Sequence, residues 1–165
     1  MTRLDHPLNT HRLRLEPVTA GVAAAAAMGT AALEARIGAH APADWRRAHV
    51  FDRQRVAVDE PVVRYALVIH RDDRRVIGEV RFDRMAPGTY EIGYAIIAPY
   101  RRFGYAAEAA GRIVRWLDEE VGAETIIAGC RMDNIASIRT LRRLGFTLDG
   151  STPNGASFWW TLERP

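Results

Sequence analysis

The stretch PYRRFGYAAEA, residues 99–109, constrains the fold more than any other feature, because it joins a strand-like run to a helical pattern. Residues 90–98 are typical of a strand, and Pro99 ends it because proline lacks the N–H that a sheet ladder needs. After Gly104, apolar residues recur at helical spacing, with two charged pairs expected on the outer face. The predicted apolar face is Ala106, Ala107, Ala110, Ile113, Val114, Leu117 and Val121, and the outer pairs are Glu108–Arg112 and Arg115–Glu119.

The rest of the chain alternates strand-like and helical patterns, with no internal repeat or linker. The pattern predicts strands over 8–17, 62–69, 75–82, 90–98, 124–130, 146–148 and 157–162, and helices over 19–37, 43–58, 105–121 and 134–144. Either Asp133 or Asn134 is expected to cap the last helix, and Gly145 to end it. This order predicts an α+β fold around one mixed sheet, and 165 residues fit a single domain, 1–165.

The composition excludes several kinds of chemistry. Cys130 is the only cysteine, so neither an intramolecular disulfide nor a cysteine-based metal site is expected. All 23 basic residues are arginines, which excludes a Schiff-base lysine and a Walker-type lysine. The five histidines, His70 in a predicted turn among them, show no metal-ligand spacing and are assigned no role.

Charge and hydropathy bear on the partners and the compartment. The net charge of +3 is modest and the arginines are scattered among acids, so nucleic acid is not expected as a partner. The chain shows neither an apolar stretch long enough for a bilayer nor a leader pattern, and the alanine run 23–27 follows a possible N-cap, Thr19. We therefore expect a cytoplasmic protein with no membrane partner, as its single cysteine also suggests.

The junction at 99–109 has the chemistry of an anion site. The first turn of a helix leaves about four N–H groups unpaired, and the peptide dipoles place about half a positive charge there. Gly104 has no Cβ and Ala106 is small, so a pyrophosphate could approach the main chain, with Arg101 and Arg102 adding charge. An ordinary turn with surface arginines is the alternative. The sequence contains neither Gly-x-Gly-x-x-Gly nor Gly-x-x-x-x-Gly-Lys, which argues against dinucleotide-binding and P-loop folds.

Two motifs together resemble one family. The pattern Arg101-x-x-Gly104-x-Ala106 after EIGYAI resembles the acetyl-CoA pyrophosphate loop of the GNAT acetyltransferase superfamily. DNIASIRTLRRLGF, residues 133–146, resembles its second cofactor-contacting segment, in the form found in the ribosomal-protein N-terminal acetyltransferase branch. The resemblance extends through THRLRLEPV and VIGEVRF to nearly the whole chain, and it implies the acyl-CoA N-acyltransferase fold.

In that fold the central sheet is mostly antiparallel, and two parallel strands splay apart to admit the pantetheine arm of the cofactor. The resemblance places the splay between residues 90–98 and 124–130. Because such a splay usually involves a β-bulge, we leave open which side chains past the middle of EIGYAII share a face.

The resemblance also implies where acetyl-CoA binds. Backbone N–H groups of Ile96 or Ile97 are expected to stabilise the oxyanion that develops during acyl transfer. Asn134 and Ser137 stand three apart on one helix face and are expected to point toward the cofactor, with Ile135 and Ile138 packed beneath. The full set of expected cofactor-binding residues is Ile96, Ile97, Ala98, Arg101, Arg102, Phe103, Gly104, Tyr105, Ala106, Asn134 and Ser137.

Acyl transfer from a thioester to an amine needs a base for the amine and a proton for the leaving thiolate. Glu91 resembles the strand glutamate proposed as the base in this superfamily, acting directly or through water, and Glu79 is a second candidate. Either could instead be a sheet-face glutamate paired with arginine. Ser137 is the proton donor by analogy, with water or a plain surface hydroxyl as alternatives. Cys130 is more typical of a small core residue than of an acetyl-enzyme nucleophile.

We therefore expect a monomeric or homodimeric N-acetyltransferase that transfers acetyl from acetyl-CoA to a primary amine by direct attack in a ternary complex. The acceptor is either a protein N-terminus or a small molecule. A non-catalytic CoA-binding or regulatory member of the fold, and a transferase for a longer acyl-CoA, are the alternatives. Phe158, Trp159 and Trp160 are predicted core and sheet-face residues, one of which could line the acceptor pocket.

Overall fold

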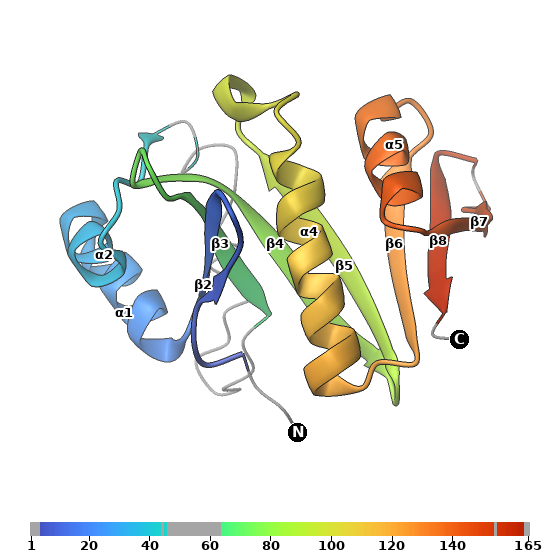
Figure 1. Cartoon of the computed structure of the whole chain (residues 1–165), viewed down its shortest axis with the longest axis horizontal. Coiled ribbons are helices and arrows are strands. Elements are labelled where there is room, and N and C mark those ends of the chain that lie inside the picture. The colour runs from blue at the N-terminus through green and yellow to red at the C-terminus, as the bar shows by residue number, and fades with distance from the viewer. Residues whose placement is uncertain (1–3, 44, 46–63, 154, 164–165) are drawn as a thin grey trace.

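The computed structural model describes residues 4–43, 45, 64–153 and 155–163, and their strands form one sheet in the order β1-β2-β3-β4-β5-β6-β8-β7 (Figure 1). Within these residues, β5 and β6 are parallel, whereas the other neighbouring strands are antiparallel. This arrangement is the mixed, mostly antiparallel sheet that the sequence predicts. The strands are β1 (Leu8–Asn9), β2 (Leu13–Pro17), β3 (Tyr65–His70), β4 (Arg75–Ala86), β5 (Thr89–Ile96), β6 (Thr125–Arg131), β7 (Thr147–Ser151) and β8 (Ser157–Glu163).

Helices lie against the central strands and beside the β2–β3 part of the sheet (Figure 1). Figure 1 shows α4 and α5 side by side in front of the central strands, and α1 and α2 beside β2 and β3. The helices are α1 (Ala20–Met28), α2 (Thr30–Ile37), the short η1 (Ala98–Tyr100), α4 (Tyr105–Trp116), its π-helical continuation η2 (Leu117–Val121) and α5 (Ile135–Arg143).

The element order is confirmed, but two predicted elements are broken in the structure. The expected strand 8–17 is two strands, because the Thr10 hydroxyl accepts the N–H of Leu13 at 2.9 Å and turns the chain. The expected helix 19–37 is two helices, because Gly29 has φ 122° and cannot continue the first one. Thr19 is the N-cap, as predicted. The expected helix 43–58, except for 43 and 45, and the start of the strand 62–69 lie outside the described residues.

Most of the predicted apolar face of α4 and η2 packs against the core: Ala110, Ile113 and Leu117 are buried, and Ala106, Val114 and Val121 are partly buried against it. Ala109 and Trp116 are buried, whereas Ala106 and Ala107 are partly exposed. The Trp116 ring meets Phe82 of β4 edge to face, with 5.3 Å between ring centroids. The buried face therefore includes the predicted residues and extends further to Ala109 and Trp116, because burial of an indole is strongly favourable.

The sheet opens between its two parallel strands. Pairing between β5 and β6 runs from Thr89 opposite Thr125 to Glu91 opposite Ile127, although β5 continues to Ile96 and β6 to Arg131. The expected bulge in β5 is wrong, because β5 pairs with β4 in unbroken register from Tyr90 to Ile96. A bulge is present nearby in the pairing of β4 with β3, at Ile77 of β4. The period-two alternation of β5 therefore holds through the splay to Ile96.

Gly78 of β4 is required for close approach at this opening. A Cβ at Gly78 would lie 2.1 Å from the carbonyl oxygen of Ala95 in β5. We predict that Gly78→Ala lowers the free energy of unfolding by about 1–3 kcal/mol, measured by urea denaturation, because one of the two backbones must move. Gly150→Ala on β7 is the control: its Cβ meets nothing within 4 Å, so a change below about 0.5 kcal/mol is expected. Equal effects of both substitutions would refute this packing argument.

Candidate functional site

The loop between β5 and α4 has a backbone shape set by two residues with positive φ. Arg102 has φ 69° and Gly104 has φ 83°, both in the left-handed region. The left-handed conformation costs a non-glycine residue about 1–2 kcal/mol, so the rest of the structure must hold Arg102 in place. A Cβ at Gly104 would lie 3.6 Å from Nη2 of Arg12, an ordinary contact. Glycine is therefore required at 104 by the backbone conformation and not by crowding within the chain.

The N-terminus of α4 is uncapped. Its first intrahelical hydrogen bond runs from Glu108 N–H to Gly104 C=O at 3.0 Å, and Gly104 offers no side chain as a cap. Within the part of the chain that the structure describes, the N–H groups of residues 105–107 have no hydrogen-bond partner. Three unpaired donors at the positive end of a helix, beside the exposed Arg101 and Arg102, can bind an anion.

Arg12, immediately before β2, contacts the first residues of α4 and the loop that precedes them. Its Nη1 donates to the carbonyl oxygen of Phe103 at 3.0 Å, its Nε donates to Glu108 at 2.7 Å, and its guanidinium lies 4.4 Å from the Tyr105 ring centre. Thr10 adds a hydrogen bond from its hydroxyl to Glu108 at 2.6 Å. We call these contacts the Arg12 clamp. Glu108 thus binds the β1–β2 turn instead of Arg112, the partner that helical spacing predicts.

The Arg12 clamp also controls the charge of Glu108. Burial raises the pKa of Glu108, but the hydrogen bonds from Thr10 and Arg12 outweigh burial, so the pKa lies below its ordinary value. Glu108 is therefore ionised at neutral pH, and its charge is matched by Arg12 instead of opposing an anion at the helix start.

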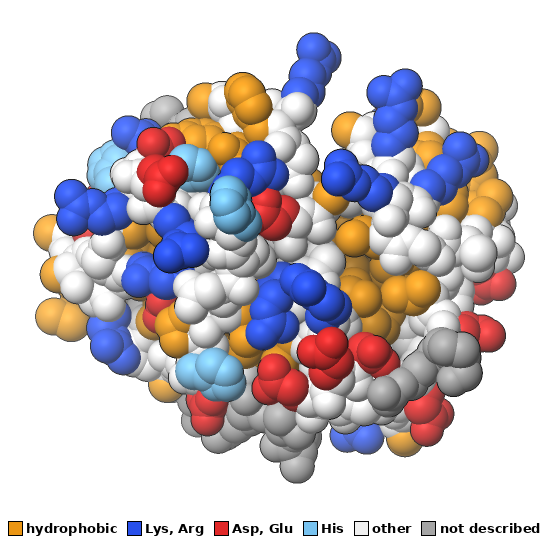
Figure 2. Space-filling view, viewed as in Figure 1, with side chains coloured by type: hydrophobic (Ala, Val, Ile, Leu, Met, Phe, Trp, Pro, Cys, Tyr) orange, Lys and Arg blue, Asp and Glu red, His pale blue; other side chains and the backbone are white. Residues whose placement is uncertain are grey.

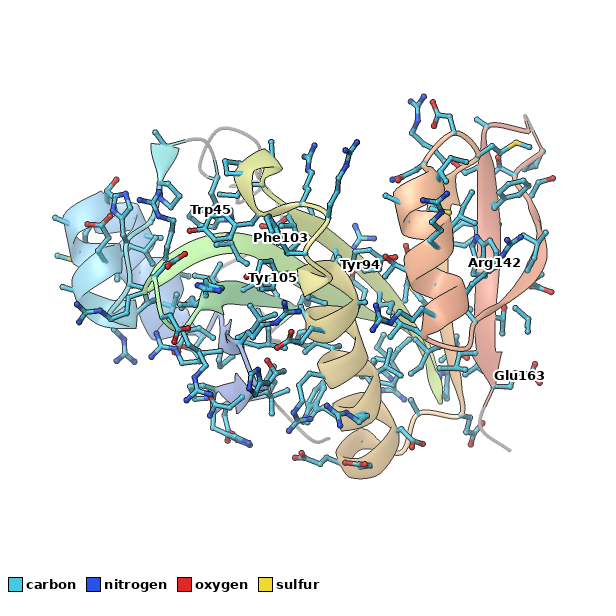
Figure 3. The ribbon with its side chains drawn as sticks, turned by 45° about the horizontal axis from the view of Figure 1, so that its top comes forward. Trp45, Tyr94, Phe103, Tyr105, Arg142 and Glu163 are labelled. Carbon is cyan, nitrogen blue, oxygen red and sulfur yellow. The ribbon has the colours of Figure 1, made fainter. Side chains whose placement is uncertain are left out.

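One face of the opened sheet brings Tyr94 and Ser137 together. Tyr94 lies on the same face of β5 as the buried Ile92 and Ile96. Its Oη lies 3.0 Å from Oγ of Ser137 on α5. Figure 3 shows Tyr94 in the space between α4 and α5. Burial raises the pKa of the Tyr94 phenol, and the hydrogen bond to Ser137 opposes part of that rise. Sequence reasoning did not single out Tyr94, although period-two alternation from Ile92 would have placed it on this face.

Asn134 is the N-cap of α5. Its Oδ1 accepts the N–H of Ser137 at 3.1 Å, which settles the choice between Asp133 and Asn134. The side-chain oxygen of Asn134 is therefore used in the helix cap, and its side-chain NH₂ group can donate to another acceptor. Ile135 is 53% exposed, so the prediction that it packs beneath the helix is wrong, whereas Ile138 is buried.

Backbone hydrogen bonds distinguish Ile96 from Ile97. Ile97 N–H donates to the carbonyl oxygen of Ile77 in β4 at 2.8 Å, so it is not available to a ligand. Because N–H groups alternate in direction along an antiparallel strand, Ile96 N–H points away from β4, into the opening toward β6. Arg101 Nε donates to the carbonyl oxygen of Ile96 at 2.8 Å and holds this strand end in place.

Glu91 lies on the opposite face of the sheet from Ser137. It stands at the last β5–β6 pair, where the opening begins, and its side chain is 17% exposed. Its Oε1 lies 3.0 Å from Nη2 of Arg81, and Arg81 also pairs with Asp83 at 3.0 Å. The arginine pairing considered for Glu91 is thus present. Glu79 occupies the same face of β4, opposite Ala95.

The tryptophans of β8 divide between the two faces. Trp160 is buried, with Arg142 of α5 5.7 Å from its ring centre. Trp159 lies across from Gly129 of β6, where an added Cβ would come within 3.2 Å of the indole, and is partly exposed. Since Gly129 shares a face with Ile127 and hence with Glu91, Trp159 is the aromatic residue of β8 on the Glu91 face.

The outer surface agrees with this arrangement. Figure 2 shows a hollow between α4 and α5 with hydrophobic side chains on its floor, basic side chains above and beside it, and acidic side chains along its lower edge. Among the described residues, no three His, Cys, Asp or Glu side chains gather in a way that could hold a metal ion. None of the helices within the described ranges is long and apolar enough to cross a membrane.

A sheet that opens beside an uncapped helix start is the architecture of acyl-CoA N-acyltransferases, as the sequence predicts. The acetyltransferase (GNAT) domain model matches residues 12–147, and the chain therefore belongs to the GNAT acetyltransferase family.

Curated relatives agree with this family, and solved structures share the fold. The chain is 35% identical over 97 residues to the uncharacterized N-acetyltransferase YnaD of Bacillus subtilis. The aligned segment covers 56% of this chain and 57% of YnaD. The matched part thus spans only about half the length of such curated relatives. A GNAT-family acetyltransferase from Bacillus anthracis has a similar fold, with a TM-score of 0.68 at 20% identity over 96% of this chain and 98% of that one.

A second solved structure, the ribosomal-protein-S5-alanine acetyltransferase of Vibrio fischeri, also shares the fold. Its TM-score is 0.66 at 16% identity, and the match covers 98% of this chain and all of the other.

The Arg12 clamp predicts a pH-dependent stability. Because the folded-state pKa of Glu108 lies below 4.5, its stabilisation is present in full above pH 4.5 and is lost as the pH falls through that lower pKa. Glu108→Gln should therefore lower the free energy of unfolding by about 1–3 kcal/mol at pH 7, a deficit that shrinks below pH 4.5. Denaturant unfolding between pH 3 and 7 measures both effects.

Glu119→Gln, at an exposed position in η2, is the matched control, with an expected change within about 0.5 kcal/mol. A deficit for Glu108→Gln that is equally large at both ends of the pH range would show that the charge of Glu108 contributes nothing to stability.

Proposed function

We propose that this protein transfers an acetyl group from acetyl-CoA to a primary amine. The observation that carries the proposal is the opening between β5 and β6, flanked by the uncapped start of α4. The pyrophosphate would bind the N–H groups of residues 104–107, with Arg101 and Arg102 beside it. The pantetheine arm would pass into the opening, where it can pair with strand edges that no longer pair with each other.

The two faces of the sheet suggest a division of chemical roles. Acetyl-CoA supplies a thioester whose carbonyl carbon the amine nitrogen attacks, so that the C–S bond breaks and a thiolate leaves. Ile96 N–H, directed into the opening, would stabilise the negative charge on the carbonyl oxygen. Glu91 would accept the proton that the amine loses, directly or through water, with Arg81 holding its carboxylate in place.

Ser137 would return a proton to the thiolate on the other face. Its Oγ is 3.0 Å from the Tyr94 hydroxyl, which can supply a replacement proton or orient the serine. Asn134 supports the same place by capping α5 through the N–H of Ser137, and its NH₂ group would donate to the cofactor. In this proposal the base, Glu91, and the acid, Ser137, lie on opposite faces of the sheet. This arrangement suits direct transfer, because the amine and the thioester can approach each other from opposite faces.

The acceptor in this proposal is a cationic amine that enters over the Glu91 face and loses a proton there. Trp159 and the carboxylates of that face provide an apolar wall and a negative charge. The likeness to the ribosomal-protein-S5-alanine acetyltransferase supports testing protein N-termini first, as the ribosomal-protein branch of the family would use.

Cofactor binding is tested with two variants at one position. Gly104→Glu and Gly104→Gln share the same backbone strain at φ 83°, but only glutamate adds negative charge to the helix start. We expect Gly104→Glu to weaken CoA binding in calorimetry at least about 10-fold more than Gly104→Gln does, because the charge repels the pyrophosphate. If the two variants bind CoA equally well, the phosphates do not bind at this helix start.

Catalysis is tested by acetyl transfer, followed by mass spectrometry, to peptides with N-terminal alanine or serine, to polyamines and to aminoglycosides. Wild type is expected to acetylate at least one of these amine classes, and Glu91→Gln to lower kcat about 100-fold. Asp83→Asn is the control, because it removes the other carboxylate on Arg81 and should change kcat by less than about 3-fold.

Full turnover in Glu91→Gln would assign the base to Glu79 or to water. Full turnover in Ser137→Ala would likewise assign the proton donor to water. Binding of CoA without transfer to any amine from acetyl-CoA or longer acyl-CoA would contradict the enzymatic proposal and favour a CoA-binding module.

A further inference from the structure

His70, at the end of β3, lies between two tyrosines that bracket the loop 101–104. Its Nε2 is 3.0 Å from the hydroxyl of Tyr105, and its Nδ1 accepts the backbone N–H of Asp73 at 3.3 Å and lies 3.1 Å from Oδ2 of the same residue. The hydroxyl of Tyr100 donates to the same Oδ2 at 2.6 Å. A continuous chain of hydrogen bonds therefore runs from Tyr105 through His70 and Asp73 to Tyr100. We call these four residues the loop staple.

The position of the loop staple gives it a specific mechanical effect. Tyr100 immediately precedes the loop 101–104 and Tyr105 immediately follows it, so the staple ties the two ends of the loop to one point on the β3–β4 turn. The His70 ring also packs against both phenol rings, at 5.7 Å and 5.2 Å between centroids, and its side chain is only 12% exposed. Ring packing and hydrogen bonds thus both fix the separation between Tyr100 and Tyr105.

The protons of the loop staple can all be placed. Because Nδ1 of His70 accepts the backbone N–H of Asp73, the neutral imidazole carries its proton on Nε2, which donates to the hydroxyl of Tyr105. Burial, followed by the hydrogen bond to Asp73, raises the pKa of Tyr100 to about 12, so its hydroxyl keeps its proton at neutral pH. Removing any one member therefore leaves its neighbour without a partner.

The Arg12 clamp lies against the other side of the same tyrosine, with its guanidinium 4.4 Å from the Tyr105 ring centre. Tyr105 is also the first residue of α4, and its N–H is one of the three unpaired donors. A shift of the Tyr105 side chain would therefore move the donors that face the bound anion. Sequence reasoning placed His70 in a turn and assigned it no role, because the histidines show no metal-ligand spacing; it is instead the last residue of β3, and the fold brings it to Tyr105, 35 positions away.

We propose that His70 and Asp73 are positioning residues for the phosphate loop: by joining Tyr100 to Tyr105 they hold the N–H groups at the start of α4 in the geometry that binds the pyrophosphate of CoA. The inference rests on the proposed function for the identity of the anion. It assigns the loop staple to cofactor affinity and not to the acetyl-transfer step, which takes place at the opening of the sheet.

The test removes single hydroxyl groups. Tyr100→Phe and Tyr105→Phe keep both rings, and His70→Phe keeps the ring packing while it removes both hydrogen bonds. Each variant is expected to weaken CoA binding in calorimetry about fivefold and to raise KM for acetyl-CoA with little change in kcat. Adding Tyr105→Phe to His70→Phe should weaken binding no further, because that hydrogen bond is already lost. Tyr90→Phe, a partly buried tyrosine of β5 outside the staple, is the control.

A probe that lacks the pyrophosphate distinguishes positioning from general damage. S-acetylpantetheine carries the thioester without the phosphates, so kcat/KM for this probe should be the same in the variants and in wild type. CoA affinities within twofold of wild type in both tyrosine variants would overturn the proposal, as would an equal loss with S-acetylpantetheine. If wild type binds CoA but transfers no acetyl group, the proposed function fails while the CoA affinities still test the staple.

Discussion

The end of hydrogen bonding between β5 and β6 is the constraint on which the rest of the structure depends. Two central strands that diverge leave backbone groups unpaired in the middle of a sheet, and buried unpaired groups are costly. The structure limits this cost locally: Arg101 binds the carbonyl oxygen of Ile96, and Ile97 returns to β4. Gly78 allows β4 to follow β5 closely at the same level. The remaining donors of β5 point into the opening, where a ligand can use them.

The anion site is built from the backbone, and side chains fix its shape. Arg12 binds the loop carbonyl, Glu108 and the face of Tyr105, while His70 and Asp73 join the two tyrosines at the ends of the loop. These contacts come from β2 and β3, which are far from the loop in sequence. A loop with left-handed residues at 102 and 104 needs such support, because nothing in its own local sequence would hold Arg102 there.

The sequence predicts the element order and the helix cap at Thr19 well, and it narrows the cap of α5 to Asp133 or Asn134, because these depend on local periodicity and side-chain chemistry. It fails where distant parts meet. Trp116 joins the buried face of α4 because it packs against Phe82 of β4, and Glu108 leaves its helical neighbour for Arg12, 96 positions away. The alternation of β5 places Glu91 and Tyr94 on opposite faces, but only the register with β4 excludes a bulge there. The roles of Glu91, Ser137 and the cofactor-binding residues stay predictions, since no ligand contact tests them.

The central claim is that backbone N–H groups at the opening and at the start of α4 bind the two halves of CoA. Amide NMR titration measures this directly. With CoA, the largest shifts should fall on the amides of residues 105–107 and of Ile96, whereas pantetheine should shift Ile96 and leave 105–107 unchanged. Shifts concentrated elsewhere, with these amides unmoved by CoA, would contradict the account.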